Sequence, residues 1–137
     1  MAFQLCPYLS FNGTAKQAIS FYKETFNAEI VELMTYGDMP DELPVEWKEL
    51  VAHSRLRIQG TELMISDSPN PVPQGKQVSI CLTFSSLEQC EQIYEALIQE
   101  GTVNMALKAT SFSPGYADVT DKFGITFQIS TEAELSA

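Results

Sequence analysis

Residues 6–11 read Cys-Pro-Tyr-Leu-Ser-Phe, and residues 79–84 read Ser-Ile-Cys-Leu-Thr-Phe. Both stretches predict β-strands, and an amphipathic helix pattern follows each of them. The copies also end alike, because residues 60–66 (Gly-Thr-Glu-Leu-Met-Ile-Ser) correspond to residues 124–130 (Gly-Ile-Thr-Phe-Gln-Ile-Ser). A duplicated small unit of this kind does not bury its apolar face alone. We therefore expect the two copies to pair and to form a ligand pocket at their seam.

Each copy predicts the element order β-α-β-β-β. The first repeat covers about residues 5–66 and the second about residues 77–131, and the proline-rich residues 67–76 between them are typical of a linker. Residues 37–49 predict a loop with a short helical turn. We expect one domain, residues 1–137, of the α+β class. In it, the tandem βαβββ units would form a curved mixed sheet around a cavity, with the helices on the outer face.

Capping signals mark both predicted helices. In the first helix, Thr14 is predicted as the N-cap of a capping box with Gln17, and Asn27 as a left-handed C-cap. In the second helix, Ser85 is predicted as the N-cap, with Glu88 reaching back. The first helix should bury a stripe of five side chains: Ala15, Ala18, Ile19, Tyr22 and Phe26. The second should bury a similar stripe: Cys90, Ile93, Tyr94, Leu97 and Ile98.

Composition excludes several classes of partner. The formal net charge of −10 argues against nucleic acid and against anionic membrane surfaces, both of which attract basic patches. No apolar run approaches the roughly 20 residues that span a bilayer, and residues 1–5 lack the pattern of a signal peptide. The odd set of widely spaced cysteines, Cys6, Cys81 and Cys90, predicts free thiols in a reducing compartment. We therefore expect a cytoplasmic protein.

Strand periodicity separates two faces of the predicted sheet. One face is apolar and should lie under the helices: Pro7, Leu9, Phe11, Leu56, Ile58, Leu63, Ile65, Ile80, Leu82, Phe84, Ala117, Val119, Phe127 and Ile129. The other face mixes polar and apolar side chains: Cys6, Tyr8, Ser10, His53, Arg55, Arg57, Glu62, Met64, Ser66, Ser79, Cys81, Thr83, Asp118, Thr120, Thr126, Gln128 and Ser130. A sealed core would not hold Arg55 and Gln128 without partners. This face predicts a wet, concave cavity, and the alternative is a half-exposed antiparallel sheet.

Several motifs together resemble a known family: residues 7–13 (Pro-Tyr-Leu-Ser-Phe-Asn-Gly), 21–23 (Phe-Tyr-Lys), 36–40 (Tyr-Gly-Asp-Met-Pro), 53–56 (His-Ser-Arg-Leu), 63–67 (Leu-Met-Ile-Ser-Asp) and 121–124 (Asp-Lys-Phe-Gly). They resemble the PhnB-like branch of the vicinal oxygen chelate superfamily, which includes glyoxalases, extradiol dioxygenases and bleomycin-resistance proteins. The resemblance covers about residues 6–130 and implies a small-molecule ligand and a homodimer. The branch usually has a Trp in its late loop, which residues 110–115 lack.

The resemblance also implies where a divalent metal would bind. Metal-dependent members of the superfamily hold the ion at four strand positions that correspond to Cys6, Met64, Ser79 and Gln128. Only Gln128 keeps an oxygen ligand of the usual kind, because a thioether and a hydroxyl are poor ligands for such an ion. We predict no metal and no other cofactor, with a divalent metal as the alternative.

Two residues on the mixed face are candidates for catalysis. His53, the only histidine, has an imidazole suited to proton transfer near neutral pH, and its alternative role is a structural hydrogen bond within the sheet. Arg55 is suited to holding an anionic group in a bidentate manner, and its alternative is a salt bridge to Glu62 or Asp118. The predicted ligand-binding residues are Cys6, Tyr8, Met64, Ser79, Cys81 and Gln128.

Two functions remain open. The first is a metal-free protein that binds a small molecule. The second is an enzyme, of the lyase, isomerase or dioxygenase type found in the superfamily, that uses His53 with Arg55 and Tyr8. PhnB-like sequences are often labelled 3-demethylubiquinone methyltransferases, but this chain has no strand–Gly-rich turn–helix fingerprint of a nucleotide cofactor.

Overall fold

The computed structural model describes residues 3–133, which fold into two compact units. Unit 1 runs to Pro73 and unit 2 starts at Gln74, close to the middle of the predicted linker. The predicted single domain and the cavity between its repeats stay predictions. Residues 1–2 and 134–137 of the predicted domain lie outside the described residues.

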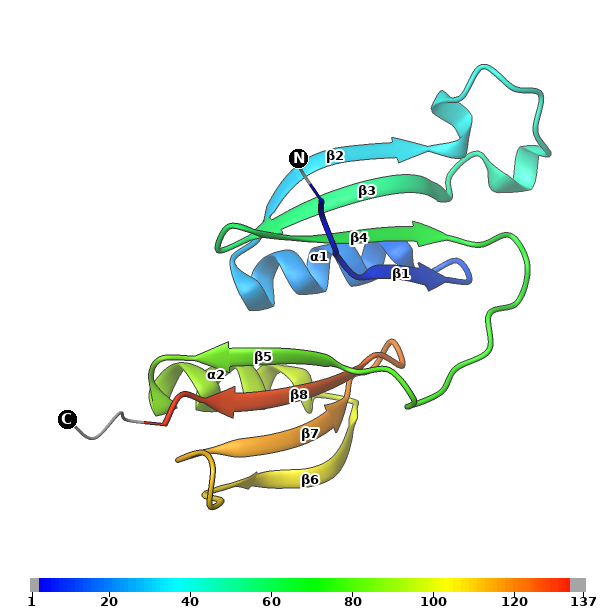
Figure 1. Ribbon diagram of the computed structural model, residues 1–137. Coiled ribbons are helices and arrows are strands. Elements are labelled where there is room, and N and C mark those ends of the chain that lie inside the picture. Colours follow the sequence, from blue (N-terminus) through cyan, green and yellow to red (C-terminus); the bar gives the residue numbers. More distant parts are fainter. Residues whose placement is uncertain (1–2, 134–137) are drawn as a thin grey trace. The chain divides into compact units, whose positions relative to one another are not determined.

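Unit 1 contains one helix and four strands (Figure 1). These are β1 (Tyr8–Phe11), α1 (Ala15–Phe26), β2 (Glu29–Thr35), β3 (Val51–Ile58) and β4 (Thr61–Asp67). The strands form a four-stranded mixed sheet in the order β1-β4-β3-β2. In this sheet β1 runs parallel to β4, and β3 runs antiparallel to both of its neighbours.

Unit 2 repeats this arrangement. Its elements are β5 (Ile80–Phe84), α2 (Leu87–Leu97), β6 (Thr102–Lys108), β7 (Tyr116–Thr120) and β8 (Thr126–Thr131), and the sheet order is β5-β8-β7-β6. The predicted α+β class and the tandem βαβββ units are therefore confirmed. Among the described residues, neither helix is long and apolar enough to cross a membrane.

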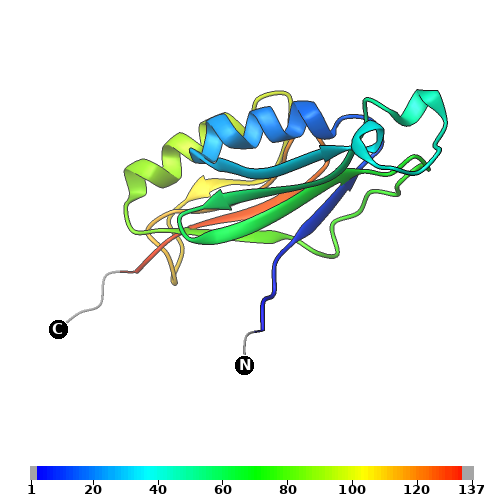
Figure 2. The same cartoon turned by 90° about the horizontal axis from the view of Figure 1, so that it is seen from above.

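Helix α1 lies along one face of the unit 1 sheet, as Figures 1 and 2 both show. All five side chains of its predicted stripe are buried, and the left-handed C-cap at Asn27 is confirmed by its φ of 54°. On the face of the sheet that packs against α1, Leu56 and Ile65 are fully buried. Because strand side chains alternate between faces, the adjacent residues Arg55 and Met64 project from the other face. That face is polar and lies outside the core of unit 1.

The predicted capping box at the start of α1 is wrong. Thr14 occupies the N-cap position, but its side chain makes no capping hydrogen bond. Instead, one carboxylate oxygen of the buried Asp67 accepts hydrogen bonds from the backbone N–H groups of Gly13 and Ala15, at 2.9 and 3.0 Å. Its other oxygen accepts from the N–H of Val51 at 3.0 Å. A carboxylate at the end of β4 thus fills the electropositive helix N-terminus.

The N-cap of α2 also differs from the prediction, by one residue. Ser86, and not Ser85, holds the N-cap position, and its hydroxyl accepts a hydrogen bond from the N–H of Gln89 at 3.2 Å. Within the predicted stripe only Cys90 and Leu97 are fully buried, and the other three residues are partly exposed.

The first strand of each unit is shorter than predicted. β1 does not extend back to Leu5, and β5 does not extend back to Val78. Proline lacks a backbone N–H, so Pro7 cannot donate to a strand ladder. Two predicted site residues, Cys6 and Ser79, therefore lie just before a strand and not within one.

The loop between β2 and β3 contains two short 3-10 turns, Tyr36–Asp38 and Val45–Trp47, which confirms the predicted loop with helical content. It projects beyond the end of the sheet in Figures 1 and 2. The ring of Trp47 lies 6.1 Å from that of Tyr36, whose hydroxyl donates a hydrogen bond to the backbone oxygen of Asp67 at 3.0 Å. These contacts tie the loop to the end of β4.

Candidate functional site

A cross-strand row of side chains crosses the polar face of unit 1. Tyr8 on β1 is paired with Met64 on β4, Met64 with Arg55 on β3, and Arg55 with Glu32 on β2. Residues paired in this way project from the same face of a sheet. The fold therefore brings together three of the predicted site residues, Tyr8, Met64 and Arg55.

His53 joins this row because it lies two residues before Arg55 on β3. The Tyr8 hydroxyl is 3.0 Å from Nδ1 of His53, and the two rings are 5.8 Å apart. On the other side of the imidazole, Nε2 is 3.8 Å from a carboxylate oxygen of Glu32. A carboxylate beside Nε2 favours the tautomer with its proton there. In that tautomer Nδ1 is the acceptor and the Tyr8 hydroxyl is the donor.

Arg55 is held by carboxylates without being hydrogen-bonded to them. Its Nε lies 3.7 Å from an oxygen of Glu32 and 3.7 Å from an oxygen of Glu62. Both distances are too long for a hydrogen bond. Nε is shielded from solvent and has no hydrogen-bond partner among the described residues, although 33% of the side chain is exposed. The predicted alternative of an ion pair with Glu62 is thus present, whereas Asp118 accepts from another residue, Asn104, at 3.1 Å.

Further charges surround Arg55. Arg57, two residues further along β3, lies 3.8 Å from Glu62 and 3.9 Å from Glu29. Gln4 donates a hydrogen bond to the second oxygen of Glu62 at 3.0 Å. The carboxylates therefore offset the arginines closely, and this part of the face is not a strongly cationic patch.

The polar face of unit 2 carries the other predicted ligand-binding residues. The side-chain amide of Gln128 donates to the Ser79 hydroxyl at 3.0 Å, and its oxygen accepts from the Tyr116 hydroxyl at 2.6 Å. Cys81 lies opposite Gln128 in the pairing of β5 with β8. Burial raises the pKa of the Tyr116 phenol, and the neighbouring Asp118 and Cys81 raise it further. The Tyr116 hydroxyl is thereby kept protonated as a donor to Gln128.

The implied metal positions do not fit a divalent ion. Cys6 and Met64 belong to unit 1, and Ser79 and Gln128 to unit 2. The amide oxygen of Gln128, which would coordinate a metal, already accepts the Tyr116 hydrogen bond. In residues 3–133, no three His, Cys, Asp or Glu side chains gather in a way that could hold an ion. The donor set alone therefore argues against the usual metal, and the metal-free state stays a prediction.

Two neighbours of the predicted residues were not foreseen. Glu32 lies on β2 and Asn104 on β6, strands that the face assignment left out. In both strands the alternation is broken by a β-bulge, between Ile30 and Glu32 and between Val103 and Met105. A bulge shifts the following side chains to the other face. Simple alternation along the strand therefore does not predict which face Glu32 lies on. Its position beside Arg55 is known only from the pairing of β2 with β3.

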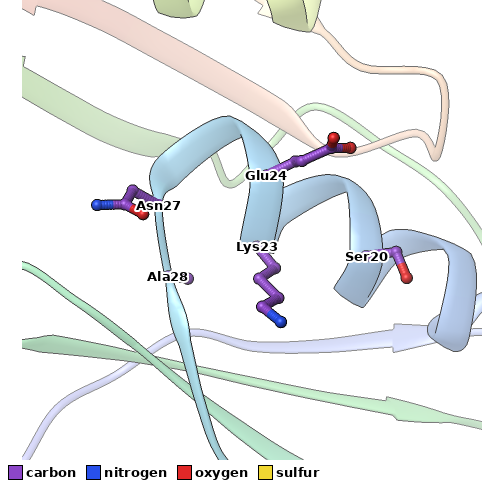
Figure 3. Close-up of a pocket in the computed structure, with 5 residues that line it drawn as sticks. All are labelled: Ser20, Lys23, Glu24, Asn27 and Ala28. Carbon is purple, nitrogen blue, oxygen red and sulfur yellow. The ribbon is translucent and has the colours of Figure 1, made fainter.

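A separate surface depression lies at the C-terminal end of α1. It is open to solvent and is lined by Ser20, Lys23, Glu24, Asn27 and Ala28. Figure 3 shows that Lys23 and Glu24 point in different directions, so their charged groups do not converge. None of the predicted site residues lines this depression, and we assign it no chemistry.

Comparison with known proteins gives consistent matches over almost the full chain. The family model described as 3-demethylubiquinone-9 3-methyltransferase matches residues 4–130. Protein YjdN of Escherichia coli (strain K12) is 30% identical, over 91% of this chain and 92% of that protein. The crystal structure of protein PA1353 from Pseudomonas aeruginosa has a TM-score of 0.89 at 31% identity and covers 97% of this chain and 100% of that chain.

Two further solved structures extend the comparison. One, from Bacillus cereus, is described as a putative 3-demethylubiquinone-9 3-methyltransferase, PhnB protein, and has a TM-score of 0.80 at 26% identity, over 94% of this chain and 99% of that chain. The genomically encoded fosfomycin resistance protein FosX from Listeria monocytogenes has a TM-score of 0.66 at 11% identity, over 96% of this chain and 94% of that chain. At that identity the likeness shows a common fold alone.

Proposed function

We propose that this chain, which belongs to the PhnB-like family of the vicinal oxygen chelate superfamily, binds a small organic acid without a metal. The model of this family carries the description 3-demethylubiquinone-9 3-methyltransferase. The ligand lies on the polar face of the unit 1 sheet, over Tyr8, Met64 and Arg55. No cofactor takes part in this binding. Binding of such an acid is a step that both functions left open by the sequence require.

The observation that carries this proposal is the state of Arg55. A shielded N–H without a hydrogen bond costs free energy, of the order of 1–3 kcal/mol, and therefore calls for an explanation. Among the described residues, no hydrogen bond is formed by the Arg55 guanidinium, whose Nε lies 3.7 Å from a carboxylate oxygen of Glu32 and 3.7 Å from one of Glu62. A guanidinium whose N–H groups lack hydrogen-bond partners is suited to binding the two oxygens of a carboxylate or phosphonate. We assign that partner to the ligand.

The surroundings of Arg55 narrow the class of ligand. Glu32 and Glu62 offset the charge of Arg55, so a multiply charged acid is disfavoured. Tyr8 and Met64 continue the row and offer an aromatic ring and a thioether, which favour contact with an apolar or aromatic group. The proposed ligand is therefore a small monoacid with an apolar part.

Methyl transfer is not the activity we propose, despite the description of the family. In doubly wound nucleotide-binding folds, the turn between the first strand and its helix contacts the cofactor. Here the carboxylate of Asp67 accepts the N–H groups of Gly13 and Ala15 in that place.

A thermal-shift experiment tests the proposal. The probes are benzoate and phenylacetate, with benzamide as the uncharged comparison, on protein dialysed against EDTA. We expect at least one acid to raise Tm, benzamide to have no effect, and Arg55→Gln to abolish the shift. Arg57→Gln is the matched control, because Arg57 shares the strand, the face and the Glu62 contact but is more exposed. Binding that needs added metal, or that survives Arg55→Gln, contradicts the proposal.

We also propose that the chain forms a homodimer and is cytoplasmic. Two of the four edge strands, β2 and β6, expose apolar side chains of the kind that a partner covers: Ile30, Leu33, Val103 and Met105. All three cysteines are free, as expected in a reducing compartment. Light scattering at micromolar concentration checks the first point, and a monomeric mass contradicts it. Cell fractionation checks the second, and recovery outside the cytoplasmic fraction contradicts it.

A further inference from the structure

We propose that Tyr8, His53 and Glu32 form a proton relay that makes the polar face of unit 1 a site of acid–base catalysis. The substrate is a small carboxylic acid with an ionisable C–H bond next to a carbonyl, such as a 2-oxo acid. This inference rests on the proposed function, because Arg55 must hold the carboxylate of the substrate.

The geometry orders the three groups in one line. The Tyr8 hydroxyl is within hydrogen-bond distance of Nδ1 of His53, at 3.0 Å, and Nε2 of the same ring faces the Glu32 carboxylate at 3.8 Å. The imidazole thus has a hydroxyl at one nitrogen and a negative charge near the other. At 3.8 Å the carboxylate is not hydrogen-bonded to the ring, but its charge stabilises the imidazolium that forms when Nδ1 accepts the proton of the hydroxyl.

The contact between Tyr8 and His53 is not dictated by the register of the sheet. Tyr8 lies on β1 and His53 on β3, and β4 separates the two strands. The directly paired neighbour of Tyr8 is Met64, and that of His53 is Met34 on β2. The two side chains therefore meet over the intervening strand. A hydrogen bond formed in this way positions two chemically active groups without contributing to strand pairing.

Exposure assigns different roles to the members of the relay. Tyr8 is 48% exposed, whereas 28% of the His53 side chain is exposed. Tyr8 is therefore the more accessible of the two residues to a ligand over this face. Tyr8 is the catalytic residue, and His53 and Glu32 are positioning residues that act through it.

The distance from Tyr8 to Arg55 suits a small substrate. One strand separates them, and neighbouring strands are about 4.8 Å apart, so their backbones lie roughly 10 Å apart across the row. Both side chains project toward the same side of the sheet. An acid of a few bonds in length bridges the space between the hydroxyl and the guanidinium.

The chemical step conserves atoms and electrons. The Tyr8 hydroxyl passes its proton to Nδ1 of His53 while its oxygen takes a proton from the carbon beside the substrate carbonyl. The electron pair of that C–H bond remains on the substrate as an enolate, whose acid group Arg55 holds. Return of a proton to the enolate carbon or oxygen completes a tautomerisation. No oxidant, reductant or metal is needed.

The test measures hydrogen–deuterium exchange at C3 of phenylpyruvate and of 2-oxobutyrate in D2O by NMR, with EDTA-treated protein. We expect the wild type to accelerate exchange at least tenfold over buffer at one or both probes. Tyr8→Phe should abolish the acceleration and keep the thermal shift that the same probe produces. Tyr94→Phe, a tyrosine of α2 outside this face, is the matched control and should keep the full rate.

For His53 and Glu32, the test must measure a property that a purely structural role would leave unchanged. Glu32→Gln should lower the exchange rate at saturating probe at least threefold without changing the probe concentration that gives half the thermal shift. His53→Ala should lose the acceleration and regain part of it when free imidazole is added. If a probe binds but exchange is not accelerated, or if Tyr8→Phe keeps the rate, the relay is wrong and the binding proposal stands. If neither 2-oxo acid binds but benzoate does, the relay is wrong and the binding proposal stands; if none of these acids binds, both proposals are wrong.

Discussion

The hydroxyl of Tyr8 and Nδ1 of His53 lie 3.0 Å apart although their strands, β1 and β3, are separated by β4. This contact, together with the incompletely partnered Arg55 beside it, distinguishes the polar face of unit 1 from that of unit 2. In unit 2, by contrast, the side-chain amide of the predicted site residue Gln128 is hydrogen-bonded through its nitrogen to Ser79 and through its oxygen to Tyr116. The chemistry that we propose is therefore assigned to unit 1.

Adjacent residues of β3 should respond differently to truncation. Leu56→Ala should lower the free energy of unfolding by about 2–5 kcal/mol, because Leu56 is fully buried under α1. Arg55→Ala should cost less than about 1.5 kcal/mol, because its side chain is one-third exposed and its ion pairs are long. Urea denaturation of both variants measures the difference. Equal losses would identify Arg55 as a structural ion-pair partner and remove it from the site.

The carboxylate of Asp67 should be one of the most stabilising polar groups of unit 1. It is 2% exposed and accepts hydrogen bonds from the N–H groups of Gly13, Ala15 and Val51. In Asp67→Asn an NH2 group must face one of these donors, so we expect a loss of about 2–4 kcal/mol. Asp38→Asn, on the exposed loop, is the control and should cost much less. A neutral effect of Asp67→Asn in urea melts would contradict this account of the helix N-terminus.

Alkaline stability should depend on Tyr116. Burial, helped by Asp118 and Cys81, raises the pKa of its phenol, so folding favours the protonated form. This contribution is complete below the unfolded-state pKa of about 10 and is lost as the pH rises through the higher folded-state value. Tyr116→Phe should therefore show a shallower fall in stability above about pH 10 than the wild type. Melts across this range that remain parallel would count against the assignment. Tyr36, whose pKa burial also raises, provides the comparison variant Tyr36→Phe.

The three free thiols should differ in reactivity. Cys90 is fully buried, and burial raises the pKa of its thiol, so little nucleophilic thiolate is present. Cys81 is exposed and Cys6 partly exposed. Reaction with a thiol reagent, followed by peptide mass spectrometry, should label Cys81 in the native protein and Cys90 only after denaturation. Rapid native labelling of Cys90 would show that α2 opens readily.

The sequence predicts the local elements well because short-range patterns determine them. The apolar stripe of α1, the cap at Asn27 and all of β3 follow from spacing that spans a few residues. The duplicated βαβββ order follows from the same patterns repeated. These signals lie within single elements, so one sequence is enough to read them.

Long-range partners are what the sequence does not predict. Thr14 carries a good capping signal, yet Asp67, more than fifty residues away, supplies the bonds to Gly13 and Ala15. Glu32 reaches His53 and Arg55 only through a bulged register. The candidate residues His53, Arg55, Tyr8 and Met64 could be chosen from their shared face. Their actual contacts depend on strand order, which local patterns leave open.

The most direct test of the central claim is the tautomer of His53. It is the only histidine in the sequence, so untagged protein labelled with 15N-histidine gives the signals of a single imidazole. Long-range 1H–15N correlation spectra of the neutral ring should show a proton on Nε2 and an acceptor at Nδ1. In Tyr8→Phe the Nδ1 signal should move toward that of a nitrogen without a hydrogen bond. A proton on Nδ1, or an Nδ1 signal that Tyr8→Phe leaves unchanged, would contradict the relay.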